Sequence, residues 1–108
     1  MWQPFFFKFI IMKRVDTQII EIEDHFYPFR FSILSFMTYQ TMYDKEITEC
    51  KTITDYIRYF YCAYIAGCNF ERSEIILTAD EFTALIDSYP EVLNDLTVAF
   101  SESQPKKK

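Results

Sequence analysis

Neighbouring carboxylates are the side chains in this sequence best suited to acid–base chemistry. They form two groups, Glu21 with Glu23 and Asp24, and Asp80 with Glu81. Paired carboxylates serve as general acid and general base when a shielded site separates their pKa values. The first group lies at the end of an expected strand and the second in the first turn of an expected helix, where negative charge is solvated or complements the helix dipole. We therefore interpret both groups as surface carboxylates and predict no catalytic residue and no enzymatic activity.

The cysteines do not form a pattern that supports metal binding or nucleophilic catalysis. Cys50, Cys62 and Cys68 include no Cys-x-x-Cys pair, and the single histidine, His25, lies in a different expected element. A cysteine nucleophile needs a nearby base, and cysteine inside an apolar helical pattern behaves as a small hydrophobic residue. The sequence contains one glycine, which excludes a glycine-rich phosphate loop. We predict reduced core thiols, no metal and no cofactor.

Composition and charge indicate a small acidic globular domain. Half of the 108 residues are hydrophobic and 19% are aromatic, which argues against disorder. Residues 1 to 105 carry 8 basic and 16 acidic side chains, a formal charge of −8. Such a surface repels phosphate backbones, so we expect no nucleic-acid partner.

The two ends of the chain differ from the rest in composition. The hydrophobic leader at residues 1–11, MWQPFFFKFII, is too short to span a membrane. Three interpretations remain open: an edge strand, an anchor onto a membrane or partner, and a mis-assigned start with Met12 as the true first residue, which we favour. We predict a single α+β domain at residues 12–103 and a flexible basic tail at residues 104–108.

A β-hairpin is expected next to the leader. The stretch from Val15 to Glu23 is rich in β-branched residues, Asp24-His25 supplies the turn, and FYPFRF at residues 26–31 alternates in the second strand. Pro28 cannot donate a ladder hydrogen bond, so its strand should lie at an edge or point that position outward. His25 should be a solvated turn residue.

About four helices are expected after the hairpin. Ser32 can cap a helix that ends near Tyr43 and buries Ile33, Phe36 and Met37. Two later helices begin at the capping signals TADE (78–81) and SYPE (88–91), and their apolar faces comprise Phe82, Leu85 and Ile86, and Val92, Leu93, Leu96 and Phe100.

The helix expected from Ile53 to Ala66 is the most apolar element. Thr52 and Asp55 form its capping signal, and Gly67 is placed to end it in a left-handed conformation. The helix carries two apolar stripes, so it must be covered on two sides. Either it runs through the centre of the bundle, which we favour, or its second stripe meets another molecule. The partner-binding hypothesis assigns that contact to Tyr59, Tyr61, Cys62 and Ile65.

Taken together, the order of elements and two passages resemble the tail assembly chaperone family of tailed phages and prophages. The passages are YPFRFS (27–32) and the ending L-T-x-x-E-F…D-x-x-P-E-x-L…A-F-x-E-S (77–103). The resemblance covers about residues 12–104 and implies a non-enzymatic protein of the host bacterial cytoplasm. Such a protein binds the tape measure protein and helps to recruit tail tube protein around it. The alternatives are a small membrane-associated protein whose leader lies in the lipid interface, and an oligomeric scaffold. A homo-oligomer is left open, and a membrane partner is disfavoured.

Overall fold

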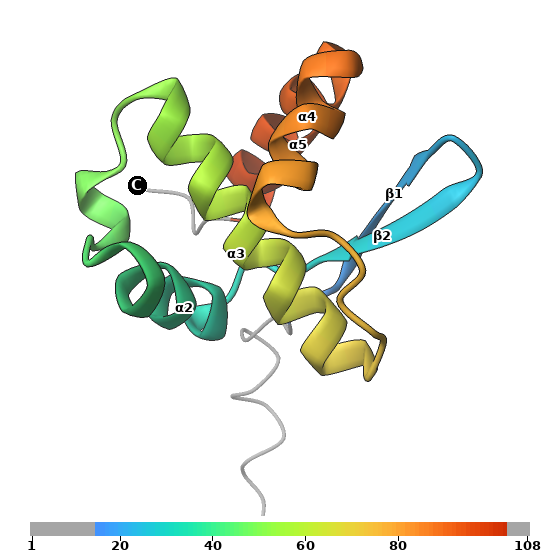
Figure 1. The fold of residues 1–108 in the computed structure, drawn as a ribbon. Helices are drawn as coiled ribbons and strands as arrows, with labels where there is room; N and C mark the ends of the chain where they lie inside the picture. Colours follow the sequence, from blue (N-terminus) through green and yellow to red (C-terminus); the bar gives the residue numbers. More distant parts are fainter. Residues whose placement is uncertain (1–14, 104–108) are drawn as a thin grey trace, which may run out of the picture.

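A two-stranded hairpin is followed by four α-helices and one short 3₁₀ helix, which confirms the α+β class (Figure 1). The computed structural model describes residues 15–103, so the predictions for the leader and for the tail lie outside the described residues. The elements are β1 (Gln18–Ile22), β2 (His25–Phe29), α2 (Ile33–Tyr43), η2 (Ile47–Glu49), α3 (Ile53–Glu71), α4 (Ala79–Ser88) and α5 (Pro90–Ser103).

The hairpin turns one residue earlier than predicted. Glu23 and Asp24 form the turn, with φ of 51° and 65°, and His25 begins β2 opposite Ile22. Positive φ at both central residues is typical of the type I′ turn, whose twist matches that of the flanking strands. The prediction that Asp24 and His25 form the turn was wrong. The two acidic residues Glu23 and Asp24 adopt the left-handed conformation instead.

Pro28 lies in the middle of β2, at a position where a proline costs no hydrogen bond to β1. Its register partner is Ile19, and the sheet formed by residues 15–103 has two strands, so β2 is an edge strand within that range, as predicted. A two-residue turn makes Ile22 and His25 the first hydrogen-bonded pair, and such pairs alternate along an antiparallel ladder. The pair of Ile19 and Pro28 is therefore a non-hydrogen-bonded pair, and the nitrogen of Pro28 points away from β1.

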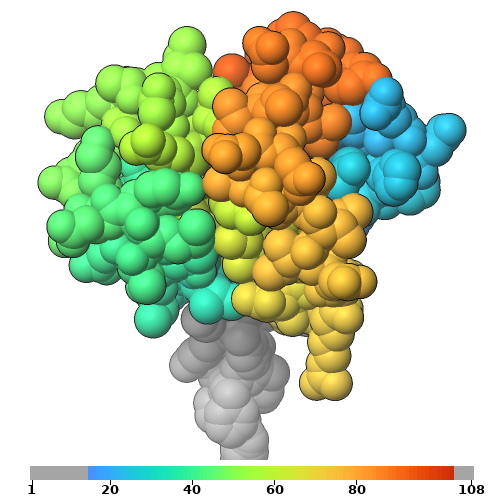
Figure 2. Space-filling model, in the orientation of Figure 1, coloured from blue at the N-terminus to red at the C-terminus, as the bar shows by residue number. Residues whose placement is uncertain are grey.

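Helix α3 crosses the middle of the molecule, and other elements cover it on several sides (Figure 1). In Figure 2 its middle is visible only as a narrow yellow-green strip between the green atoms of α2 and the orange atoms of α4. The strand β2 also packs against it, and just beyond that strand the backbone N–H of Arg30 donates to the carbonyl oxygen of Ala63 at 3.0 Å. The prediction that this helix runs through the centre of the bundle is therefore confirmed.

Gly67 does not end α3, contrary to the prediction. The helix continues to Glu71, and Arg72 provides the left-handed cap with φ of 58°. A Cβ atom on Gly67 would lie 2.6 Å from the carbonyl carbon of Pro28 and 2.9 Å from the nitrogen of Phe29. Glycine is needed here because the backbone of β2 lies directly against the helix, and that contact is invisible in the local sequence.

The buried face of α2 also differs from the prediction. Ser35 and Tyr39 are buried, whereas Ile33 is 73% exposed and Met37 is 56% exposed; only Phe36 is partly buried as expected. The Oγ atom of Ser35 lies 2.8 Å from the hydroxyl oxygen of Tyr59 on α3. A polar residue can occupy a core position when it has such a partner, and here it displaces the more apolar residues to the outside.

The last two helices follow the sequence closely. Thr78 and Glu81 form the predicted reciprocal cap, with Oγ1 of Thr78 accepting from the N–H of Glu81 at 3.1 Å and the N–H of Thr78 donating to Oε1 of Glu81 at 2.9 Å. The predicted start of α5 at Ser88 was wrong, because Ser88 is the last residue of α4; the carbonyl oxygen of Tyr89 accepts the hydrogen bond from the N–H of Val92 at 2.9 Å in the first turn of α5. The predicted apolar faces of both helices are buried or partly buried, as follows: Phe82, Leu85, Ile86, Val92, Leu93, Leu96 and Phe100.

Candidate partner-binding surfaces

The residues predicted to contact a partner lie in or against the core. Tyr59, Tyr61 and Cys62 are buried, and Ile65 is partly buried against the same cluster. A buried side chain offers no area to another molecule. The structure therefore assigns the second stripe of α3 to internal packing, because α2, α4 and the connection before α4 cover it.

The tyrosines of α3 use their hydroxyl groups inside the molecule. Tyr61 donates to the carbonyl oxygen of Leu77 at 2.8 Å, and the hydroxyl oxygen of Tyr64 accepts from the N–H of Ile76 at 3.0 Å. These two bonds hold the connection between α3 and α4 against α3. The need for such anchors accounts for tyrosine instead of phenylalanine at these positions, including Tyr61, which the partner-binding hypothesis assigned to an interface.

The three thiols are free and buried, as predicted. Burial raises the pKa of the Cys62 thiol to about 12 and that of Cys50 to about 11. Burial also raises the pKa of Cys68. Because the thiolate is the reactive form, these groups stay protonated and unreactive at neutral pH.

The carboxylates considered for acid–base chemistry are not gathered into one site. Glu81 caps α4, and Glu23 accepts a hydrogen bond from the hydroxyl of Tyr89. Asp24 is an exposed turn residue, and the exposed His25 has its Nδ1 atom 3.1 Å from the carbonyl oxygen of Glu23. Local structure thus explains Glu81 and Asp24, as the sequence suggested, whereas Glu23 is engaged by a residue distant in sequence.

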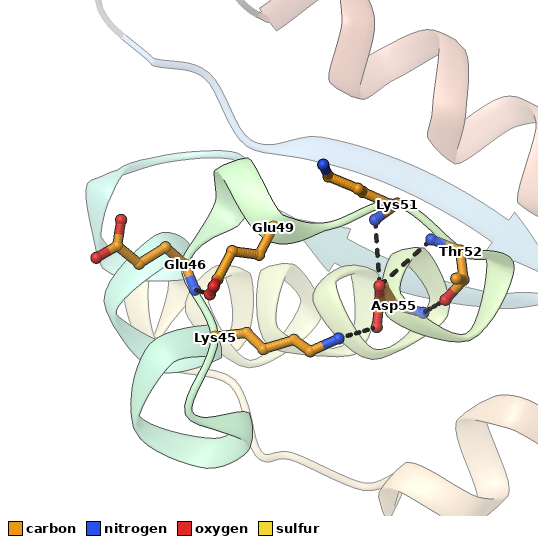
Figure 3. A network of polar contacts seen from close by, with 6 residues as sticks. All are labelled: Lys45, Glu46, Glu49, Lys51, Thr52 and Asp55. Atoms are coloured by element: carbon orange, nitrogen blue, oxygen red, sulfur yellow. Dashed lines mark hydrogen bonds and ion pairs between the residues drawn. The ribbon is translucent and has the colours of Figure 1, made fainter.

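Asp55 is a buried carboxylate at the centre of a polar network, shown in Figure 3. Its Oδ1 atom lies 3.0 Å from Nζ of Lys45, and its Oδ2 atom accepts from the backbone N–H of Lys51 at 3.1 Å and from that of Thr52 at 3.3 Å. The ion pair with Lys45 and these hydrogen bonds hold the pKa of Asp55 well below its usual range. The network ties the segment before α3 to the first turn of that helix, so its role is structural.

An apolar patch on α2 is the surface that the sequence missed. We call Ile33, Leu34 and Met37 the α2 patch; their side chains are 73%, 44% and 56% exposed. Positions 33, 34 and 37 are neighbours on one face of a helix. Apolar residues occur on several sides of α2, so periodicity alone could not show which side faces solvent.

Two shallow grooves flank α5. One, of about 380 Å³, lies between β1 and α5 and is lined by Gln18, Ile19, Ile20, Glu21, Asp95, Val98, Ala99 and Glu102. The other, of about 400 Å³, lies between the start of α3 and α5 and is lined by Ile53, Tyr56, Leu93, Thr97, Phe100 and Ser101. Both are open surfaces suited to contact with another chain.

Residues 15–103 contain no cluster of metal-ligating side chains. Within the same range, none of the helices has the length and apolar character that a membrane crossing requires. Comparison of the chain with protein-family models, with curated proteins and with solved structures finds no match.

Proposed function

We propose that this protein is a non-enzymatic tail assembly chaperone of a tailed phage or prophage. In this proposal it acts in the bacterial host cytoplasm, where it binds the tape measure protein and aids assembly of tail tube protein. The resemblance in the YPFRFS passage and in the helical ending supplies the identity of these partners. The resemblance also rests on the order of a hairpin, a central helix and two later helices, and β1, β2, α3, α4 and α5 follow that order.

The observation that carries the binding role is the α2 patch. Three large apolar side chains lie side by side on one helix, and the most exposed of them, Ile33, is 73% exposed. Contiguous apolar surface of this kind marks interaction sites in soluble proteins. An amphipathic helix of a partner can bury its own apolar face against such a surface. A chaperone for a long, aggregation-prone protein needs that kind of contact.

The test is capture of partners by the tagged full chain, coexpressed with the genes that surround it. We expect mass spectrometry to identify a tape-measure-like protein or a tail tube protein. The double substitution Ile33→Ser with Met37→Ser should abolish recovery of that protein. The matched control, Ile75→Ser with Ile76→Ser, changes two exposed isoleucines of the connection before α4 and should leave recovery unchanged.

Two results would overturn the proposal. Recovery of the chain alone, in a fixed self-assembled state, would favour an oligomeric scaffold. Recovery of membrane proteins, lost when residues 1–11 are deleted, would favour the membrane-associated alternative.

A further inference from the structure

Within residues 15–103, the strand β1 has a free edge. The sheet formed by these residues consists of β1 and β2, and the other side of β2 lies against α3. Because Ile22 and His25 form the first hydrogen-bonded pair, the backbone groups of Ile19 and Glu21 point away from β2. The N–H and C=O groups of both residues are therefore available to another strand.

This free edge forms one wall of the groove between β1 and α5. On the α5 side the groove is lined by Asp95, Val98, Ala99 and Glu102. These positions are spaced by three and four residues, so they share one face of the helix. The groove thus combines backbone hydrogen-bonding groups, an apolar strip and two helical carboxylates.

In the part of the chain that the structure describes, no basic side chain balances the charge of the groove. Within residues 15–103, the structure places no basic side chain against Glu21, Asp95 or Glu102. The ion pair found in that range joins Lys45 to Asp55, neither of which lines the groove. All 16 acidic residues but only 5 of the 11 basic residues lie in this range, which gives it a formal charge of −11. An occupant of the groove should therefore be basic.

We propose that the groove between β1 and α5 binds an extended, basic segment of a partner protein, which adds to β1 as a third strand. The two outward-facing residues of β1 offer up to four backbone hydrogen bonds, and alternate side chains of the added strand face the carboxylates. A segment of about five residues matches the length of β1.

A second copy of this chain is a poor occupant. Pairing of β1 with β1 of another copy would bring the carboxylates of both grooves together, and both molecules carry the same strong negative charge. Like charges along a strand edge are a known device against self-association. The same charges favour a strand that carries lysine or arginine.

This inference goes beyond the proposed function. The groove does not include any residue of the α2 patch, and its chemistry holds whether or not the chain acts in tail assembly. The two proposals can therefore fail separately.

The test uses the full chain and three fluorescein-labelled peptides, with binding measured by fluorescence anisotropy at low salt. The first peptide is Ser-Lys-Val-Lys-Val-Lys-Ser, which is extended and basic. The second replaces each lysine with glutamate. The third keeps the same side chains and carries N-methyl groups on the backbone nitrogens of all its lysines and valines, which blocks strand addition through either edge while preserving charge. We expect the basic peptide to bind at least tenfold more tightly than the other two.

Two protein variants locate the binding site. Asp95→Asn with Glu102→Gln should weaken the basic peptide about fivefold and reduce its salt dependence. The matched control, Glu71→Gln with Glu74→Gln, removes two exposed carboxylates elsewhere and should have no effect. Ile19→Pro removes an outward N–H and should weaken binding at least tenfold; its register partner is already a proline.

Circular dichroism and thermal melting of each variant separate loss of binding from loss of fold. Equal binding of the basic and N-methylated peptides would overturn strand addition. Equal binding of the basic and acidic peptides, or an unchanged affinity in the Asp95 and Glu102 double variant, would overturn recognition of positive charge by this groove.

Discussion

At the scale of single residues, polar groups inside this small protein are mostly paired, and their partners explain residue types that the sequence left ambiguous. Tyr59 is buried with its hydroxyl group on Ser35, whereas the hydroxyl of Tyr39 is buried without a nitrogen or oxygen partner in residues 15–103. The Cys50 thiol beside Tyr39 is only a weak hydrogen-bonding group. Buried hydroxyls with and without a partner should differ in their contribution to stability.

This difference leads to a matched pair of substitutions. Tyr59→Phe should lower the free energy of unfolding by about 0.5–1.5 kcal/mol, because a buried hydrogen bond is lost. Ser35 keeps its other bond, in which its hydroxyl donates to the carbonyl oxygen of Ser32 at 2.6 Å. Tyr39→Phe should be neutral or stabilising, because it removes a buried hydroxyl that lacks a strong partner. Urea denaturation measures both, and an equal loss in the two variants would contradict the assignment.

The lowered pKa of Asp55 predicts how stability depends on pH. The pKa of this carboxyl group is below its value of about 3.9 in the unfolded chain, so the folded state favours the ionised form. The stabilisation is then fully present above the unfolded pKa and is lost as the pH falls below about 4 toward the folded pKa. Asp55→Asn should therefore be less stable than wild type at pH 7, and the difference should shrink in acid.

Thermal denaturation at pH 7 and at pH 3 measures this effect. Asp95→Asn serves as the control, because Asp95 is exposed and has no ion-pair partner in the described residues, so its substitution should change the melting temperature little at either pH. If Asp55→Asn destabilised the protein equally at both pH values, the ionised form of the Asp55 carboxylate would not be what stabilises the network.

At the scale of elements, the contact of β2 with α3 organises the domain. The backbone of β2 closely approaches Gly67 of α3, and Arg30, the residue after β2, makes two further contacts with α3: its N–H donates to the carbonyl oxygen of Ala63, and its guanidinium lies 3.6 Å from the ring centre of Phe70. A strand and a helix normally pack through side chains. Here a single glycine lets one backbone lie against the other, so the position should not accept even a methyl group.

Gly67→Ala tests this contact directly. Alanine is the better helix former by about 1 kcal/mol, so helix propensity alone predicts stabilisation. The added Cβ would overlap the backbone of Pro28, which cannot move as a flexible side chain can. We expect a net destabilisation of about 1–3 kcal/mol. Asn69→Ala, at an exposed position of the same helix, should be neutral or stabilising when measured by the same denaturation experiment; stabilisation by both would contradict the close approach.

At the scale of the whole molecule, one hydrophobic cluster connects β1 and β2 with α2, α3, α4 and α5. Aromatic rings from distant segments meet in it: the ring centre of Phe100 lies 5.6 Å from that of Phe31 and 5.2 Å from that of Tyr59. The three thiols belong to the same cluster. Their exposure should therefore require opening of the core as a unit.

Thiol labelling measures that opening. In the folded protein, Cys50, Cys62 and Cys68 should react with a disulfide reagent at pH 8 at least about 100-fold more slowly than in denaturant, because they are buried and protonated. All three should become reactive at the same urea concentration. A single thiol that labels rapidly in the native state would show that its part of the core opens separately.

The sequence by itself determined the class of fold and most of the elements, because their signals are local. Alternation marks the hairpin, and reciprocal caps mark the starts of α3 and α4 at Thr52 and Thr78. The tertiary structure decided which faces are buried, since burial depends on what lies opposite a residue. It placed Tyr61 in the core and Ile33 outside, gave Gly67 its role, and brought β1 beside α5. The partner surfaces follow from those placements, which no local pattern records.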